Sequence, residues 1–111
     1  MEDYDGTADM KKAHEINLIG ERWALVTCDA LPEISQVKIC ERVKDICYLY
    51  AADLIKLRVK TDSCSEYLDD SPYNTSRVNS YEKCMSEVEK SLKTLINTYY
   101  DRLKQAETKL D

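Results

Sequence analysis

Cysteines are the residues of this chain that are most able to do chemistry. Cys40 and Cys47 lie seven residues apart in the apolar stretch from Lys38 to Leu54. On one helix this spacing separates two residues by ~10.5 Å along the axis, whereas a disulfide needs Cα atoms within ~7 Å of each other. Helical metal ligands lie one turn apart, which this spacing also misses. We therefore predict that both thiols pack as small hydrophobic side chains in a core.

The other cysteines form no catalytic or metal-binding motif. Cys28 and Cys84 lie beside apolar positions, which predicts the same packing role. Cys64 lies in a polar, acidic stretch and is expected to be exposed and unreactive. Five cysteines is an odd number, and the acidic start of the chain does not resemble a signal peptide. We expect five reduced thiols in an intracellular protein, cytoplasmic or nuclear. A mature secreted chain that begins at an added Met would show the same features.

Other residues offer little support for catalysis. His14 is the only imidazole in the chain, and its charged neighbours predict a solvent-facing position on a helix. Asp53 is the one carboxylate in an apolar run, and Lys56 three residues on predicts a surface ion pair. Two glycines are too few for a phosphate-binding loop. We therefore expect no catalytic residue, no metal, no cofactor and no enzyme activity.

The charge distribution narrows the class of partner. The net charge is −5, and no window is strongly basic, which argues against nucleic acid as a partner. No apolar run approaches the ~20 residues that cross a bilayer, so membrane insertion is not expected. Residues 1–8 are predicted to be an acidic flexible tail. Tyr4 in this tail and Ser71 before Pro72 are candidate phosphorylation sites, although Ser71 also suits a helix N-cap.

Apolar residues recur at alternating steps of three and four, which is the periodicity of a helix with one buried face. Helices are expected at about 8–28, 31–60 and 76–109, with a polar acidic loop at 61–75, in a single domain over 9–110. This pattern predicts an all-α fold, an antiparallel three-helix bundle with coiled-coil-like packing. The second helix is apolar on most sides and should be central. The predicted core is Ile16, Ile19, Trp23, Val26, Cys40, Val43, Cys47, Leu54, Leu57, Met85, Val88, Leu92 and Leu95.

The apolar faces are wider than three helices need to cover one another. The bundle could therefore be completed to four or more helices by a partner or by dimerisation. We predict a non-enzymatic protein–protein interaction module, a small helical subunit or adaptor of a hetero- or homo-oligomer. The alternative is a small helical ligand carrier or inhibitor that uses a tyrosine-lined space, since the chain has eight Tyr and no Phe. The candidate interface residues are Leu18, Leu25, Ile39, Ile46, Ile55, Ile96, Tyr100 and Leu103.

Overall fold

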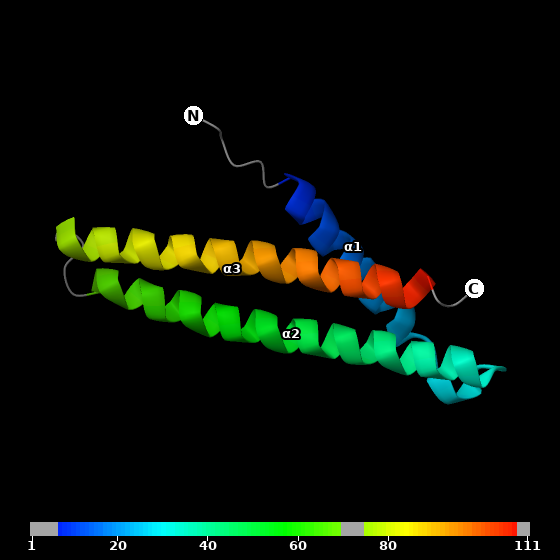
Figure 1. The fold of residues 1–111 in the computed structure, drawn as a ribbon. Coiled ribbons are helices and arrows are strands. Elements are labelled where there is room, and N and C mark those ends of the chain that lie inside the picture. Colours follow the sequence, from blue (N-terminus) through cyan, green and yellow to red (C-terminus); the bar gives the residue numbers. More distant parts are fainter. Residues whose placement is uncertain (1–6, 70–74, 109–111) are drawn as a thin grey trace. The chain divides into compact units, whose positions relative to one another are not determined.

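The computed structural model describes residues 7–69 and 75–108. The described residues form three α-helices and no strand (Figure 1): α1 (Thr7–Ala24), α2 (Ile34–Asp69) and α3 (Thr75–Thr108). A 3-10 turn, η1 (Cys28–Ala30), lies between α1 and α2. The helices pack against one another, and the predicted all-α three-helix bundle is confirmed. The candidate phosphorylation sites Tyr4 and Ser71 lie outside the described residues.

The connection between α1 and α2 is longer than the sequence predicted. α1 ends at Ala24, and the Val26 N–H donates to the Trp23 carbonyl at 3.1 Å. α2 begins after Pro32, whose missing N–H suits a position just before a helix. The Glu33 carbonyl accepts the Val37 N–H at 3.0 Å and so starts the helical hydrogen-bond series. Cys28 therefore lies in a connection and not in a helix.

The predicted loop over 61–75 is wrong for its first part, because α2 continues to Asp69. No Gly or Pro interrupts the chain between Pro32 and Pro72. The Thr61 and Ser63 hydroxyls donate to the carbonyls four residues earlier, at 2.9 and 3.2 Å. Hydroxyls bonded in this way are satisfied within the helix, and such bonds destabilise it only slightly. A polar composition was therefore not sufficient to end the helix.

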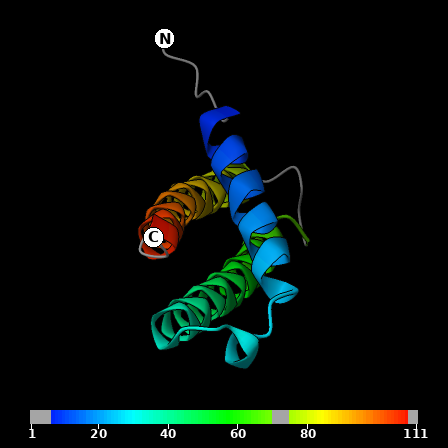
Figure 2. The ribbon, with the colours of Figure 1, turned by 90° about the vertical axis from the view of Figure 1, so that its right-hand side faces the viewer.

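Unit 1, one of two compact units in the chain, comprises Met1–Tyr50 and Ile96–Asp111. Within it, α1 lies over the first part of α2 and the last part of α3 (Figure 2). The Trp23 indole N–H donates to the Glu107 carboxylate at 2.8 Å, and the rings of Tyr50 and Tyr99 meet edge to face at 5.5 Å. The buried hydrophobic residues of this unit are Ile16, Ile19, Trp23, Ile39, Cys40, Val43, Tyr50, Ile96, Tyr99, Leu103 and Ala106.

Unit 2, Ala51–Leu95, consists of the remaining parts of α2 and α3. Among its described residues only Cys64 and Val88 are buried hydrophobic side chains. The predicted core residue Leu92 is 36% exposed. Four more of them, Leu54, Leu57, Met85 and Leu95, are half-buried, as are Val26 and Cys47 of unit 1. Two helices alone bury only one side of each apolar stripe, which explains why this unit has so small a core.

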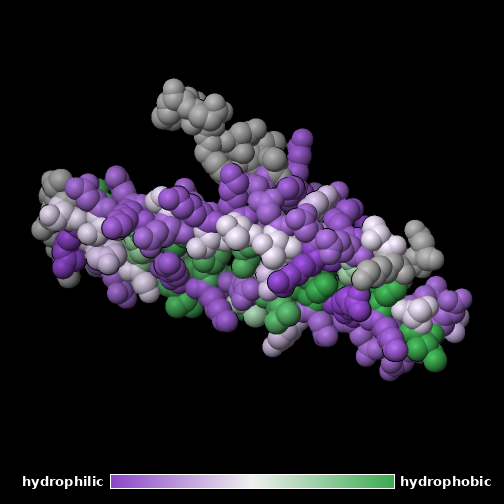
Figure 3. Space-filling model, viewed as in Figure 1, coloured by the Kyte–Doolittle hydropathy of each residue, from purple (hydrophilic) through white to green (hydrophobic). Residues whose placement is uncertain are grey.

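The second helix is not buried on most sides, contrary to the prediction. Leu49 is 48% exposed and Ile55 63% exposed. Figure 3 shows hydrophobic residues reaching the surface along α2 on the face in view. The helix has apolar residues around its circumference, but only one side of it contacts other elements.

The prediction of five reduced thiols is also wrong, because four cysteines form two disulfides. Cys28 pairs with Cys40, with Cα atoms 5.5 Å apart, and Cys64 pairs with Cys84, with Cα atoms 5.6 Å apart. Cys64, expected to be exposed, is fully buried. Cys47 is free and does not bridge Cys40, as the helical spacing required. Periodicity within one helix excluded a local bridge correctly but carried no information on bridges between elements.

Candidate binding groove

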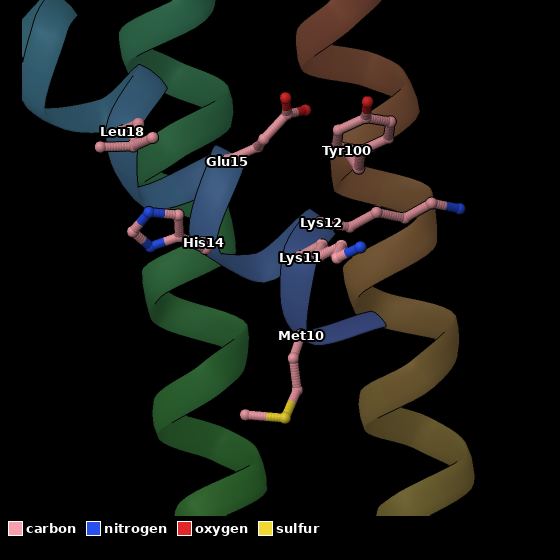
Figure 4. Close-up of a pocket in the computed structure, with 7 residues that line it drawn as sticks. All are labelled: Met10, Lys11, Lys12, His14, Glu15, Leu18 and Tyr100. Carbon is pink, nitrogen blue, oxygen red and sulfur yellow. The ribbon is translucent and has the colours of Figure 1, made fainter. Parts of the chain in front are cut away.

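The feature with a candidate function is an open groove of about 830 Å³ in unit 1 (Figure 4). Successive turns of α1 provide six of its lining residues, and α3 provides one. We call this feature the α1 groove. It is lined by Met10, Lys11, Lys12, His14, Glu15, Leu18 and Tyr100.

Two apolar side chains of the α1 groove are exposed to solvent. Met10 is 73% exposed and Leu18 is 43% exposed. His14 lies between them at helical spacing, and Figure 4 shows the three side chains following one side of α1. A thioether side chain adapts its shape to different contacts. Exposed apolar groups in a groove mark binding surfaces in soluble proteins.

A partly buried hydrogen-bond network joins the start of α1 to α3. The Lys12 ammonium donates to the Asn97 amide oxygen at 2.6 Å. The Asn97 amide nitrogen in turn donates to the Asp9 carboxylate at 3.2 Å. Asp9 is only 9% exposed, so its charge is compensated inside this network. The Asn97 amide of α3 therefore positions Lys12, which lines the groove.

Tyr100 provides the aromatic face of the α1 groove. The Lys12 and Lys104 ammonium nitrogens lie 5.5 and 5.9 Å from its ring centroid, within the range of cation–π attraction. A hydrogen bond to Glu15 raises the pKa of the Tyr100 hydroxyl above its ordinary value, and desolvation and nearby carboxylates add to this. The hydroxyl therefore stays protonated at neutral pH and donates to Glu15. A lysine ammonium, a carboxylate and a neutral phenol therefore meet where α1 and α3 line the groove.

Nothing in the groove forms a catalytic arrangement. His14 is exposed, and the groove holds no Ser, Thr or Cys that it could activate. Within the described residues, no group of three or more His, Cys, Asp or Glu side chains could hold a metal ion. The arrangement is suited to binding, through apolar contact and charge.

The only free thiol within the described residues lies in a second, smaller groove of unit 1, of about 300 Å³. Cys47, Trp23 and Tyr48 contribute to its lining. Burial raises the pKa of the Cys47 thiol, and the negative charge of Glu107 adds to the effect. A protonated thiol is a poor nucleophile. Cys47 is half-buried in this groove, and its predicted role as a packing residue stays a prediction.

The structure separates the candidate interface residues into three groups. Leu18 and Tyr100 lie together in the α1 groove. Leu25 and Ile55 are exposed elsewhere, Leu25 in the α1–α2 connection and Ile55 in unit 2. The remaining four lie in the core of unit 1 or at its edge: Ile39, Ile96 and Leu103 are buried, and Ile46 is half-buried.

Sequence reasoning missed Met10, Lys11 and Lys12 as groove residues. Met10 precedes Leu18 by eight residues, which is a helical repeat, and this spacing could have extended the stripe. Tyr100 was among the candidate interface residues, but its place beside Glu15 depends on the packing of α3 against α1.

The sequence matches no protein-family model, and it has no significant match among curated proteins or solved structures. Within residues 7–69 and 75–108, no helix combines the length and apolarity needed to cross a membrane.

Proposed function

We propose that this protein is a non-enzymatic protein–protein interaction module that binds its partner in the α1 groove. The observation that carries the proposal is the exposure of Met10 and Leu18 in a groove that Tyr100 also lines. An amphipathic partner segment would remove these side chains from water, and burial of apolar area supplies most of the free energy of such contacts. A small subunit or adaptor of a larger assembly fits this role.

A small-molecule carrier is the second candidate function. The volume of about 830 Å³ lies in the range of ligand sites, and Tyr100 provides an aromatic wall. Such sites bury most of the surface of their ligand. Because Met10 at one end is 73% exposed, a small ligand would remain largely in water. A polypeptide that continues beyond the groove is the better fit. Native mass spectrometry of the purified protein would reveal a co-purifying ligand and so favour the carrier.

The two disulfides bear on where the protein acts. The expectation of an intracellular location rested on reduced thiols, and the bridges remove that premise. Disulfides persist in oxidising compartments. We propose that the protein folds and acts in such a compartment. Alkylation of the protein from its native source, before and after reduction, tests this proposal by mass. One labelled cysteine before reduction supports it, and five labelled cysteines contradict it.

Photo-crosslinking at a single position tests the interaction. A photoreactive amino acid replaces Leu18 in one variant and the exposed Glu41 of α2 in a control variant. Each purified variant, with its disulfides formed, is illuminated in an extract of the native source. We expect a discrete adduct with a second polypeptide from position 18 and none from position 41.

A second change makes the result specific to the groove. Met10→Asp places a charge at the other end of the apolar stripe and is expected to abolish the adduct formed at position 18. Because Met10 is exposed, this change should leave the helical circular dichroism signal unchanged. An adduct that persists with Met10→Asp, or no adduct at all, contradicts the proposed function.

A further inference from the structure

The two cysteines of the unit 2 bridge differ in their access to solvent. Cys64 is fully buried, whereas Cys84 is half-buried and lines an open groove of about 560 Å³. We call this feature the unit 2 groove, and its other lining residues are Lys60, Ser63, Glu66, Tyr67 and Arg77. Thiol–disulfide exchange depends on access to the sulfur that is attacked. A thiol that enters this groove therefore reaches Cys84 and not Cys64.

The packing of unit 2 gives its bridge little support. A fold that holds two thiols together stabilises their bridge by as much as the bridge stabilises the fold, because the two equilibria are linked. Among the described residues of unit 2, Val88 is the only buried hydrophobic side chain besides Cys64. Once this bridge is reduced, the two thiols are free to separate. Their separation favours the reduced form.

The bridge of unit 1 has more support from its surroundings. Eleven buried hydrophobic residues, Cys40 among them, form the core of unit 1. The Cys28–Cys40 bridge also closes a shorter loop, with a sequence separation of 12 residues against 20 for Cys64–Cys84. A shorter loop costs less chain entropy to close. After reduction, Cys28 and Cys40 stay near each other at a high effective concentration, so this bridge re-forms more readily.

We propose that the Cys64–Cys84 bridge is a reduction-sensitive switch, which a dithiol reductant opens by attack at Cys84. Reduction opens unit 2 while unit 1 stays folded. It exposes the apolar side chains that unit 2 half-buries, which are Leu54, Leu57, Met85 and Leu95. The inference goes beyond the proposed function, which concerns the α1 groove of unit 1.

The exchange proceeds in two steps. A thiolate of the dithiol attacks the Cys84 sulfur, and a new S–S bond forms as the Cys64–Cys84 bond breaks. The Cys64 sulfur leaves with the electron pair of that bond and takes up a proton. The second thiolate of the reductant then attacks its own sulfur in the mixed disulfide and releases Cys84, which also takes up a proton. The dithiol is oxidised to a disulfide, and the bridge gains two electrons and two protons.

Equilibration with mixtures of reduced and oxidised dithiothreitol compares the two bridges in one sample. The full chain, with both disulfides formed at the start, is quenched with acid, alkylated and mapped by mass spectrometry. We expect Cys64–Cys84 to be half reduced at a ratio of reduced to oxidised dithiothreitol roughly 10-fold or more below that for Cys28–Cys40. Half reduction of both bridges at the same ratio, or of Cys28–Cys40 first, overturns the inference.

Hydrogen exchange at the ratio that reduces only Cys64–Cys84 tests the conformational consequence. Amides of residues 55–69 and 76–90 should exchange roughly 100-fold faster than in the oxidised protein, and amides of residues 14–22 should be unchanged. Unit 2 amides that stay protected after reduction would show that the bridge controls no opening, and would overturn the inference. Crosslinking at position 18 is a separate measurement, so this inference and the proposed function fail independently.

The site of attack is read from the mixed disulfide. Lys60 and Arg77 in the groove are offset by Glu66 and by Glu87, which pairs with Lys60 at 3.9 Å, so an uncharged thiol is the suitable probe. Brief treatment with 2-mercaptoethanol, followed by acid and N-ethylmaleimide, should leave the mercaptoethanol adduct on Cys84 and the maleimide on Cys64. Adducts mainly on Cys64 overturn the inference.

A matched pair of variants tests the role of the unit 2 groove. Ser63 is exposed and lines the groove, so Ser63→Phe should slow adduct formation at Cys84 roughly threefold or more, because exchange depends on access to the sulfur. Ser86 of α3 is exposed and does not line the groove, so Ser86→Phe should have little effect. Equal rates in the two variants overturn the inference.

Discussion

Replacement of Cys64 and Cys84 by alanine is expected to open unit 2 while unit 1 stays folded. The bridge joins α2 to α3 across a sequence separation of 20 residues. Apart from the bridged Cys64, the only buried hydrophobic side chain among the described residues of unit 2 is Val88. The bridge is therefore the principal constraint on this pair of helices.

The separation of 20 residues sets the size of the effect. A loop of this length loses ~11 cal/mol/K of chain entropy when it is closed, so the bridge stabilises the folded state by about 3 kcal/mol. If the free energy of opening falls by this amount, the open form of unit 2 is populated roughly 100 times more often. Unit 1 keeps its own bridge, Cys28–Cys40, and a core of eleven buried hydrophobic residues, so its opening should change little.

Hydrogen exchange followed by mass spectrometry measures this directly. In the Cys64→Ala, Cys84→Ala variant, amides of residues 55–69 and 76–90 should exchange roughly 100-fold faster than in the unmodified protein. Amides of residues 14–22 should be unchanged. Cys47→Ala removes the free thiol and no bridge, and serves as the control. Unchanged exchange in unit 2 would refute the argument that the bridge holds this pair of helices. Equal acceleration in both units would refute their independence.

Three further predictions concern unit 1. Glu107→Gln removes the carboxylate that accepts hydrogen bonds from Trp23 and Arg22. It should destabilise the protein by about 1–2 kcal/mol, measured by urea denaturation. An unchanged urea midpoint would contradict the role of this contact. A Cβ at Gly20 would lie 3.9 Å from the Cys47 sulfur, which is an ordinary van der Waals contact. Gly20→Ala should therefore stabilise α1 by about 0.5–1 kcal/mol and raise the melting temperature. A lower melting temperature would show that α1 needs the space. Because burial raises the pKa of Cys47, the protonated thiol is favoured in the folded state, and its contribution to stability is present at neutral pH and lost as pH rises through the raised value. The urea midpoint of the unmodified protein should then fall more between pH 7 and pH 10 than that of Cys47→Ala, and equal falls would contradict this assignment.

The helical class of the protein was readable from the order of its residues. Ile16, Ile19 and Trp23 recur at steps of three and four, and all three are buried in unit 1. Such spacing is a property of a single helix, so it needs no knowledge of what the helix contacts. The same geometry correctly kept Cys40 and Cys47 apart.

The ends of the helices and the pairing of the cysteines depend on contacts between elements that are distant in the sequence. α2 runs nine residues past its predicted end at Lys60, to Asp69, and this brings Cys64 to Cys84. α1 stops at Ala24, and this frees Cys28 to reach Cys40. A disulfide depends on the distance between two elements, and that distance is not encoded in the spacing within either one.

Some features of the α1 groove follow from the sequence alone, and others depend on the tertiary structure. The sequence by itself determined that Met10, His14 and Leu18 share one side of a helix, because a helix repeats every 3.6 residues. It also determined that Lys11, three residues before His14, lies beside them. Only the tertiary structure decided that Tyr100 stands opposite, 85 residues from Glu15, because that juxtaposition depends on how α3 packs against α1.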